Sequence, residues 1–423
     1  MQEKKIKNQG KISRTYVSLF GGFGINRRRY YISDYGNYHP LDEYLNFPKK
    51  QLSYSIQSLI GQNSTEEDYR ESVRILNELL PLNLEGSQAK RIVEDLSPLV
   101  DDYYEQQNRL SLEKEKIEGS FLAFGNDGKG VPIVKRERGQ GGTGDVGRLM
   151  KGKKRGVKKQ ATVAVSFSFD PRKRDSEDIL RGLFRETTPA DIENKDEKDR
   201  RFSKNVHKRG FMCNQNKAIN YSIDDLIRRN PEKSKKIIAL VDCGTGLESG
   251  IINSIKSHDL QDNLEAIIAD IVHVSEYVWK AGNAILGEKY KGRSLWVRGV
   301  MKDLLESKTE KVIQDLKANV EKTNLTVSKK EQVEKTIKYL TNHGHKMDYK
   351  SYLEKGYPIS TGLIEGCCGH LIKDRMEHSG MRWTIQGAQN MIDLRAVKKN
   401  QDWKEFIAFV KTKNNPQKLR IRA

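Results

Sequence analysis

Residues 236–241, Lys-Ile-Ile-Ala-Leu-Val, are the stretch that decides the fold class. Five apolar residues in a row are typical of a strand that is buried on both faces of a parallel sheet. A second, mostly apolar run covers residues 264–269, and residues 247–258 between the two runs predict a crossover helix. A strand, a helix and a strand in this order predict an α/β fold with parallel strands.

Two further runs add strands upstream of this pair. Residues 120–125 form a short apolar run that leads into Asn-Asp-Gly, and residues 161–169 contain the longest series of β-forming residues. Downstream, helical periodicity dominates residues 274–286 and 302–339. We therefore expect a mixed sheet that is followed by helices.

Three acidic residues have placements that suggest a site. Asp127 and Asp242 each follow a predicted strand, and ligand sites on open α/β sheets form beyond the carboxyl ends of strands. Glu365 lies in the first turn of a predicted helix that is rich in small residues. If the three carboxylates converge, they form an oxygen-rich site that suits two Mg²⁺ or Mn²⁺ ions, which promote in-line phosphoryl transfer.

Each of these residues also has an ordinary structural interpretation. An Asp after a strand is often a turn or N-cap residue, and the helix dipole favours a Glu in a first turn. Asp270 also ends a predicted strand, so it is an alternative to Asp242 as the second ligand. His273 either reaches a phosphate or orients a carboxylate, or it is a satisfied, half-buried histidine.

Composition favours a polyanionic partner. The chain has 423 residues, a net charge of +19 and a pI near 9.5, which is typical of a nucleic-acid-binding surface but also of a soluble basic protein. No apolar run approaches the roughly 18 residues that span a bilayer, so we expect no membrane partner. Four cysteines without a Cys-x-x-Cys pair favour the reducing cytoplasm and argue against a zinc ribbon.

Two basic segments are candidate DNA contacts. The loop 135–160 is rich in Gly and Lys, and it is either a solvated insert or a contact to the phosphate backbone. The second segment follows Glu365. Its basic residues suit a clamp on DNA phosphates, and its tryptophan suits stacking on an unpaired base. Alternatively, the basic residues form a charged helix surface and the tryptophan anchors the core. The candidate contacts are Lys153, Lys154, Arg155, Lys158, Lys159, Lys373, Arg375, Arg382 and Trp383.

The N-terminal part has a different pattern. Residues 14–35 alternate β-formers and aromatics and predict a hairpin. Two helices follow, for which Thr65 and Ser87 are the expected N-caps. The pair is either a helix-turn-helix that docks in a DNA groove or an ordinary helical hairpin.

Two blocks of sequence resemble the signatures of ISKra-type insertion-sequence transposases, which are bacterial DDE transposases of the Mutator-like group. They are residues 270–280, which begin Asp-Ile-Val-His, and residues 362–383, Gly-Leu-Ile-Glu-Gly-Cys-Cys-Gly-His and onward to Met-Arg-Trp. Shorter stretches that also resemble the family are residues 20–48, 127–133, 239–244 and 388–396.

The resemblance implies an RNase H-like core with a helical insertion before the last acidic helix. Asp127 and Asp242 match the two aspartates of the family, and Glu365 matches the glutamate. Asp270 and His273 match its Asp-x-x-His motif. The chain departs from the family at Cys368-Gly369, where relatives tend to carry a larger or basic residue, and in the length of its Gly/Lys loop.

These observations predict a bacterial transposase that binds terminal inverted repeats and target DNA as a homodimer or larger assembly. It would cleave DNA with Mg²⁺ or Mn²⁺ and transfer the strand. The alternatives are an RNase H-like nuclease without strand transfer and a non-catalytic DNA-binding protein. The expected organisation is a β-rich segment at 1–50, a helical DNA-binding region at 51–118, the first part of the core at 119–275, a helical insertion at 276–358 and the last part of the core at 359–423.

Overall fold

The computed structural model divides the chain into two compact units. The sheet unit comprises residues 114–130 and 160–369, and the helical unit comprises residues 1–113, 131–159 and 370–423. The residues that the structure describes are 6–33, 35–110, 118–137, 158–186, 202–213, 215–322, 325–378 and 380–413.

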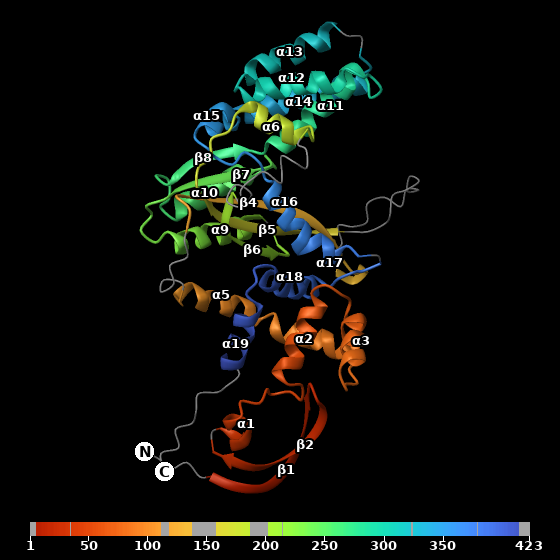
Figure 1. Ribbon diagram of the computed structural model, residues 1–423, viewed down its shortest axis with the longest axis vertical. Helices are drawn as coiled ribbons and strands as arrows, with labels where there is room; N and C mark the ends of the chain where they lie inside the picture. The colour runs from red at the N-terminus through yellow and green to blue at the C-terminus, as the bar shows by residue number, and fades with distance from the viewer. Residues whose placement is uncertain are drawn as a thin grey trace. The chain divides into compact units, whose positions relative to one another are not determined.

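A mixed five-stranded sheet forms the centre of the sheet unit (Figure 1). Its strands are β4 (Phe121–Pro132), β5 (Lys158–Phe169), β6 (Ser203–Phe211), β7 (Lys236–Val241) and β8 (Leu264–Ala269), in the order β6-β5-β4-β7-β8. Strands β4, β7 and β8 run parallel, whereas β5 and β6 are antiparallel. The α/β class and the two parallel strands predicted from their apolar runs are confirmed.

One face of the sheet is covered by α9 (Gln215–Arg229) and by the crossover helix α10 (Leu247–Ser257). Leu122 and Phe124 of β4 belong to the buried cluster that these helices complete with Ile219, Ile223 and Ile251. Because side chains alternate along a strand, the even-numbered residues of β4 face these helices and the odd-numbered ones face the opposite side.

The opposite face receives the short helix α16 (Gly362–Cys368). A Cβ atom added to Gly125 would lie 2.1 Å from Cδ1 of Ile364 and 2.9 Å from the carbonyl oxygen of Leu240. The bare glycine is therefore what allows α16 to lie directly on β4, and Asp127 shares this face with Gly125.

The sequence-based prediction that the first strand ends before Asp127 is wrong. Strand β4 continues through the Asn-Asp-Gly triplet to Pro132. The amide of Asn126 is buried and donates to Ser222 Oγ of α9 at 3.3 Å, so the asparagine that suggests a turn is instead a core hydrogen-bonding residue. Asp127 thus lies inside a strand rather than after one.

A stack of helices completes the sheet unit. It consists of α11 (Ile271–Leu286), α12 (Arg293–Leu305), α13 (Thr309–Lys322) and α14 (Val327–His343), with α6 (Ser176–Leu183) and α15 (Tyr349–Glu354) beside α12. The periodic stretch 302–339 is not one helix: it is broken after Leu305, where Ser307 has a left-handed φ of 59°.

In the helical unit, segments from the two ends of the sequence pack together (Figure 1). Its helices are α2 (Tyr54–Ser64), α3 (Tyr69–Leu79), α4 (Gly86–Leu96), α5 (Leu99–Leu110), α17 (Asp374–Met376), α18 (Ile385–Lys399) and α19 (Trp403–Lys413). Helix α18 contacts α2, α4 and α5. The predicted last segment 359–423 is thus divided between the two units.

One buried arginine explains why α18 packs against helices from the N-terminal part of the chain. Arg395 of α18 is fully buried, and it donates hydrogen bonds to the carbonyl oxygens of Leu371, His370 and Thr65. Its guanidinium also lies 3.2 Å from a carboxylate oxygen of Glu66. A buried cation with these partners holds α18 to the end of α2.

The predicted helix starts are shifted by a few residues. Thr65 ends α2 instead of starting α3, which begins after Asp68, whose carboxylate accepts from the backbone N–H groups of Arg70 and Glu71. Helix α4 starts after Glu85 rather than at Ser87. The carboxylate of Asp68 caps α3, whereas Glu85 forms a capping box with Gln88 at the start of α4.

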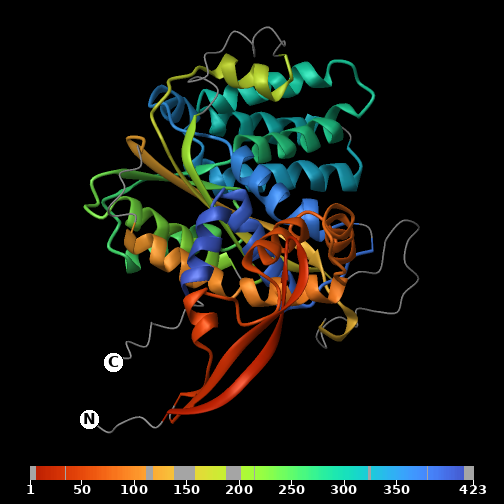
Figure 2. The same ribbon diagram turned by 60° about the horizontal axis from the view of Figure 1, so that its bottom comes forward.

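The N-terminal hairpin is present. Strands β1 (Ile6–Ser18) and β2 (Gly21–Ile32) pair antiparallel, and β3 (Gly36–Tyr38) and the short helix α1 (Pro40–Tyr44) follow. Figure 2 shows β1 and β2 as a long twisted ribbon. Across the described residues, no helix combines the length and the apolar character that a membrane span requires.

Gly125→Ala tests whether α16 depends on the bare glycine. We expect it to lower the free energy of unfolding by about 1–3 kcal/mol, because the added methyl group forces α16 or β7 away. Ile364→Val removes the nearest atom, so the double variant should lose less stability than the sum of the two single variants in denaturant unfolding. Additive losses would contradict the contact.

His207 of β6 makes stability depend on pH. Its Nε2 lies 2.9 Å from the hydroxyl of Tyr221, and burial, assisted by the positive charge of Arg209, lowers its pKa from 6.5 to about 4. As the pH falls, the imidazole of His207 is protonated in the unfolded chain before it is protonated in the folded one. The free energy of unfolding therefore decreases as the pH falls from 6.5 towards 4. In His207→Gln we expect a smaller loss over this window, measured by urea unfolding. The exposed His345→Gln serves as the control and should keep the wild-type loss.

Candidate active site

The sheet register places three aspartates in a row. Gly125 pairs with Leu240 between β4 and β7, and Val241 pairs with Ala269 between β7 and β8. Continued by one or two residues, these registers align Asp127 of β4 with Asp242 and Asp270, which come directly after β7 and β8. Asp127 shares the α16 face of β4 with Gly125, because alternate residues of a strand point to the same side.

Glu365 of α16 lies next to this row. Its neighbour Ile364 packs on Gly125, and its own carboxylate is exposed. Desolvation raises the pKa of Glu365, and the negative charges of Asp270 and Asp127 raise it further, whereas His273 opposes them. The structure therefore brings Glu365 within electrostatic reach of two of the predicted aspartates and of the predicted histidine.

Cys368 is a contact that sequence analysis did not find. It lies one turn after Glu365, is buried and hydrogen-bonds to Asp127. Burial and the negative charge of Asp127 both raise the pKa of the Cys368 thiol, so it stays protonated and donates to the carboxylate. The position where the chain departs from the transposase pattern is thus a position that touches the candidate site.

Asp270 has a structural role in this arrangement. It is completely buried, and its two oxygens accept from the backbone N–H groups of Val272, His273 and Thr361 and from the hydroxyl of Thr361. Four donors satisfy the lone pairs of a carboxylate. Asp270 thereby caps α11 and fixes the residue that precedes α16.

Asp242 has a different environment. It is half-buried, and its Oδ1 accepts from the backbone N–H of Gly244 at 2.9 Å. The chain turns sharply after it, because Cys243 has a left-handed φ of 61°. Of the two alternatives for the second ligand, Asp242 is the one whose carboxylate is not consumed by buried hydrogen bonds.

The donor chemistry of Asp127, Asp242 and Glu365 suits a hard divalent cation, which prefers carboxylate oxygens. Desolvation raises the pKa of Glu365 most, and the negative charges of Asp270 and Asp127 add to it. As the side chains stand, no three His, Cys, Asp or Glu residues within the described ranges are gathered closely enough to hold an ion. To hold an ion, the side chains of Asp127, Asp242 and Glu365 would have to turn towards a common centre.

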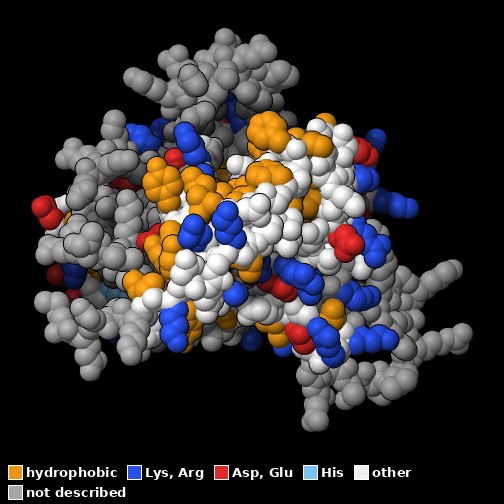
Figure 3. Space-filling view, turned by 90° about the horizontal axis from the view of Figure 1, so that it is seen from below, with side chains coloured by type: hydrophobic (Ala, Val, Ile, Leu, Met, Phe, Trp, Pro, Cys, Tyr) orange, Lys and Arg blue, Asp and Glu red, His pale blue; other side chains and the backbone are white. Residues whose placement is uncertain are grey.

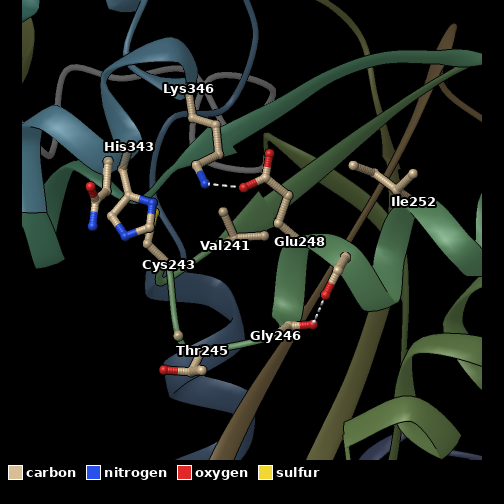
Figure 4. A pocket seen from close by; sticks show the side chains of 11 residues that line it. Val241, Cys243, Thr245, Gly246, Glu248, Ile252, His343 and Lys346 are labelled. Atoms are coloured by element: carbon tan, nitrogen blue, oxygen red, sulfur yellow. Dashed lines mark hydrogen bonds and ion pairs between the residues drawn. The ribbon is translucent and has the colours of Figure 1, made fainter.

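A cavity of about 480 Å³ opens beside the end of β7 (Figure 4). It is lined by the loop from Cys243 to Gly246, where α10 begins, and by His343 and Lys346. Lys346 is almost completely buried, and its ammonium is paired with Glu248 at 2.5 Å. Sequence analysis can identify the glycines of this loop, but no sequence pattern predicts that Lys346 lies opposite them.

The predicted DNA contacts are not equivalent in the structure. Lys153, Lys154 and Arg155 lie outside the described residues. Lys158 and Lys159 belong to β5 rather than to a loop, and the ammonium of Lys158 is 2.5 Å from Glu377. Lys158 therefore meets a phosphate only by exchanging this partner.

In the second basic segment, two of the predicted contacts are buried. Arg375 donates to the carbonyl oxygen of Ser64, and its guanidinium lies 5.0 Å from the ring centroid of Trp383. Trp383 donates through Nε1 to the carbonyl oxygen of Met376, so both side chains anchor the core of the helical unit. Lys373 and Arg382 are exposed, and they remain available as phosphate contacts.

Comparison of this sequence with family models and with curated proteins finds no match. The assignment of roles in the following subsections therefore rests on the register, the contacts and the charges described above.

Alanine at Asp270 and at Asp242 separates the structural from the candidate catalytic aspartate. We expect Asp270→Ala to cost about 2–4 kcal/mol of unfolding free energy, because four buried donors lose their acceptor. Asp242→Ala should cost less than about 1 kcal/mol, since its carboxylate is half-buried. Chemical unfolding of the two variants measures the difference, and equal losses would contradict the assignment.

Proposed function

We propose that this protein is a DNA transposase of the DDE type with an RNase H-like core. The observation that carries the proposal is that Glu365 of α16 lies within electrostatic reach of Asp127, and that the β4–β7 register, continued past Val241, aligns Asp127 with Asp242. The strand order supports the same core: the first strand of the unit is central, its next two partners form an antiparallel pair on one side, and two parallel strands lie on the other.

In this proposal Asp127, Asp242 and Glu365 would hold two Mg²⁺ or Mn²⁺ ions, and the chemistry that such ions would supply is the activation of a water or a 3′-hydroxyl and the stabilisation of the leaving oxygen. Cys368 orients Asp127 by donating a hydrogen bond to it. Asp270 keeps the start of α16 against the sheet, so Glu365 stays over the aspartate row. The net charge of +19 supports DNA as the substrate around this acidic site.

The proposed substrates are the terminal inverted repeats of a bacterial insertion sequence and a target DNA. Cleavage leaves a 3′-hydroxyl on the element, and this hydroxyl attacks a phosphate of the target, whose own 3′-oxygen departs. Pairing two element ends requires at least a homodimer on the DNA. The site of action is the nucleoid in the cytoplasm.

A nuclease without strand transfer would use the same residues, so the two activities differ only in their products. A purely structural role for the acids is disfavoured by Glu365, which is exposed and is repelled by its neighbours. A residue that stabilises a fold is instead expected to have partners of opposite charge or hydrogen-bond donors.

Glu365→Gln tests the catalytic role. We expect the rate of Mg²⁺-dependent nicking of supercoiled plasmid and the yield of joined products to fall by at least about 100-fold. The reason is that the negatively charged ligand carboxylate becomes a neutral amide. DNA affinity should be retained. Glu276→Gln is the matched control, since Glu276 is an exposed acid of α11 whose negative charge also raises the pKa of Glu365. It should keep activity within about twofold of the wild type.

A catalytic role for Glu365 also predicts the thermal stability of Glu365→Gln. Because desolvation and, after it, neighbouring negative charges raise the pKa of Glu365, the ionised carboxylate is less stable in the folded chain than in the unfolded one at neutral pH. Glu365→Gln should therefore melt at the same temperature as the wild type or higher in metal-free buffer. A clearly lower melting temperature together with unchanged nicking would establish a structural residue and refute the proposal.

A further inference from the structure

The ribbon formed by β1 and β2 has two unlike faces. The inner face carries Arg14 and Arg27, whose guanidinium groups both pair with Asp42 of α1. Arg14 also donates to the carbonyl oxygens of Pro48 and Lys50. These contacts fix the ribbon on the segment that follows it, so its orientation within the helical unit does not depend on the outer face.

The outer face consists of residues that pair directly across the two strands and are all exposed. The pairs are Lys11 with Arg28, Ser13 with Asn26, and Thr15 with Gly24, and Gly22 continues the face towards the turn. From one end to the other, the outer face presents two cations, then hydroxyl and amide groups, then glycines. In the view from below, Lys and Arg side chains lie beside surface formed by backbone and other side chains, with hydrophobic side chains interspersed (Figure 3).

The charge of this region is one-sided. The described residues of the ribbon and of β3 include no Asp or Glu, and they include six cations: Lys7, Lys11, Arg14, Arg27, Arg28 and Arg29. Among the described residues, Arg14 and Arg27 both form ion pairs with Asp42, and the structure shows no ion pair for the other four cations. The remaining positive charge favours an anionic partner over a second copy of the same basic surface, which would repel it.

The shape and the chemistry of the outer face match one polyanion in particular. The major groove of B-DNA, about 12 Å wide, admits a two-stranded β-ribbon, and asparagine, serine and threonine hydrogen-bond to base edges there. Glycines at positions 22 and 24 leave no side chain to hold the backbone away from the bases. Phe20 at the turn is 91% exposed, and an exposed aromatic ring suits contact with thymine methyl groups.

We propose that the outer face of the β1–β2 ribbon lies in the major groove of double-stranded DNA and reads base sequence through Ser13, Thr15 and Asn26, while Lys11 and Arg28 contact phosphates. This inference rests on the proposed function, because it takes DNA as the substrate. It assigns sequence recognition to the ribbon, whereas the helical pair α3–α4 is the region to which the sequence pattern points.

The test is in vitro selection with the full-length protein and a pool of random-sequence duplexes. The wild type should enrich a motif. Ser13→Ala/Asn26→Ala should lose information at two or more positions of that motif and weaken binding to the selected duplex by about 10–100-fold, with affinity for unselected duplex within about twofold. These side chains are exposed, so the melting temperature should not change.

A second variant separates phosphate contacts from base reading. Lys11→Ser/Arg28→Ser should weaken binding to every duplex and make the slope of log affinity against log salt shallower by about two. Lys329→Ser/Lys330→Ser removes the same charge from exposed positions of α14 and should leave that slope unchanged.

The outcomes distinguish this inference from the function on which it rests. If the Ser13/Asn26 variant selects the wild-type motif, or if the Lys11/Arg28 variant behaves like the α14 control, the ribbon assignment is overturned and plasmid nicking remains as evidence for the transposase. Altered oligomer mass in light scattering with unchanged DNA selection would show a copy-to-copy interface and also overturn it. If the wild-type protein binds no duplex, both proposals fall.

Discussion

The buried carboxylate of Asp270 is the interaction on which the sheet unit depends. It ends β8, caps α11 and accepts two hydrogen bonds from Thr361, the residue before α16. A single charged group thus joins the sheet, the first helix of the helical stack and the helix that carries Glu365. Four donors around one desolvated carboxylate make this junction specific, because any displacement of α11 or α16 would leave buried donors without an acceptor.

The second constraint is steric. Gly125 allows Ile364 to lie on β4, and this places Glu365 and Cys368 over the neighbouring Asp127. Desolvating Glu365 and bringing it near Asp270 and Asp127 both cost free energy, and both raise its pKa. The sheet and the Asp270 junction hold the acids in place against this repulsion. Such an arrangement stores negative charge that a bound cation neutralises, and this is the electrostatic logic behind the proposed phosphoryl-transfer site.

Sequence patterns predicted the parts of the fold that depend on local hydrophobicity. The runs at 236–241 and 264–269 are strands, because an uninterrupted apolar stretch has few alternatives to burial in a sheet. Local signals failed where a distant partner decides the outcome. Asn126 resembles a turn residue until Ser222 of α9 provides its hydrogen bond.

The same limit applies to the candidate contacts. Arg375 and Trp383 have the residue types of a DNA clamp, and only their burial against one another and against the carbonyl of Ser64 shows that they are core residues. The hydrogen bond of Cys368 to Asp127 and the use of all the lone pairs of Asp270 are likewise invisible in a linear pattern, since they depend on where α16 meets the sheet.

The packing of α18 against α2, α4 and α5 has a consequence for biosynthesis. On the ribosome, α2, α4 and α5 are made long before α18, so the apolar faces that they present are covered only after residues 385–399 have emerged. A nascent polypeptide without these residues exposes the faces and lacks Arg395, the cation that binds the end of α2. Such intermediates are natural clients for chaperones and proteases, so the helical unit matures only on chains in which α18 has been synthesised.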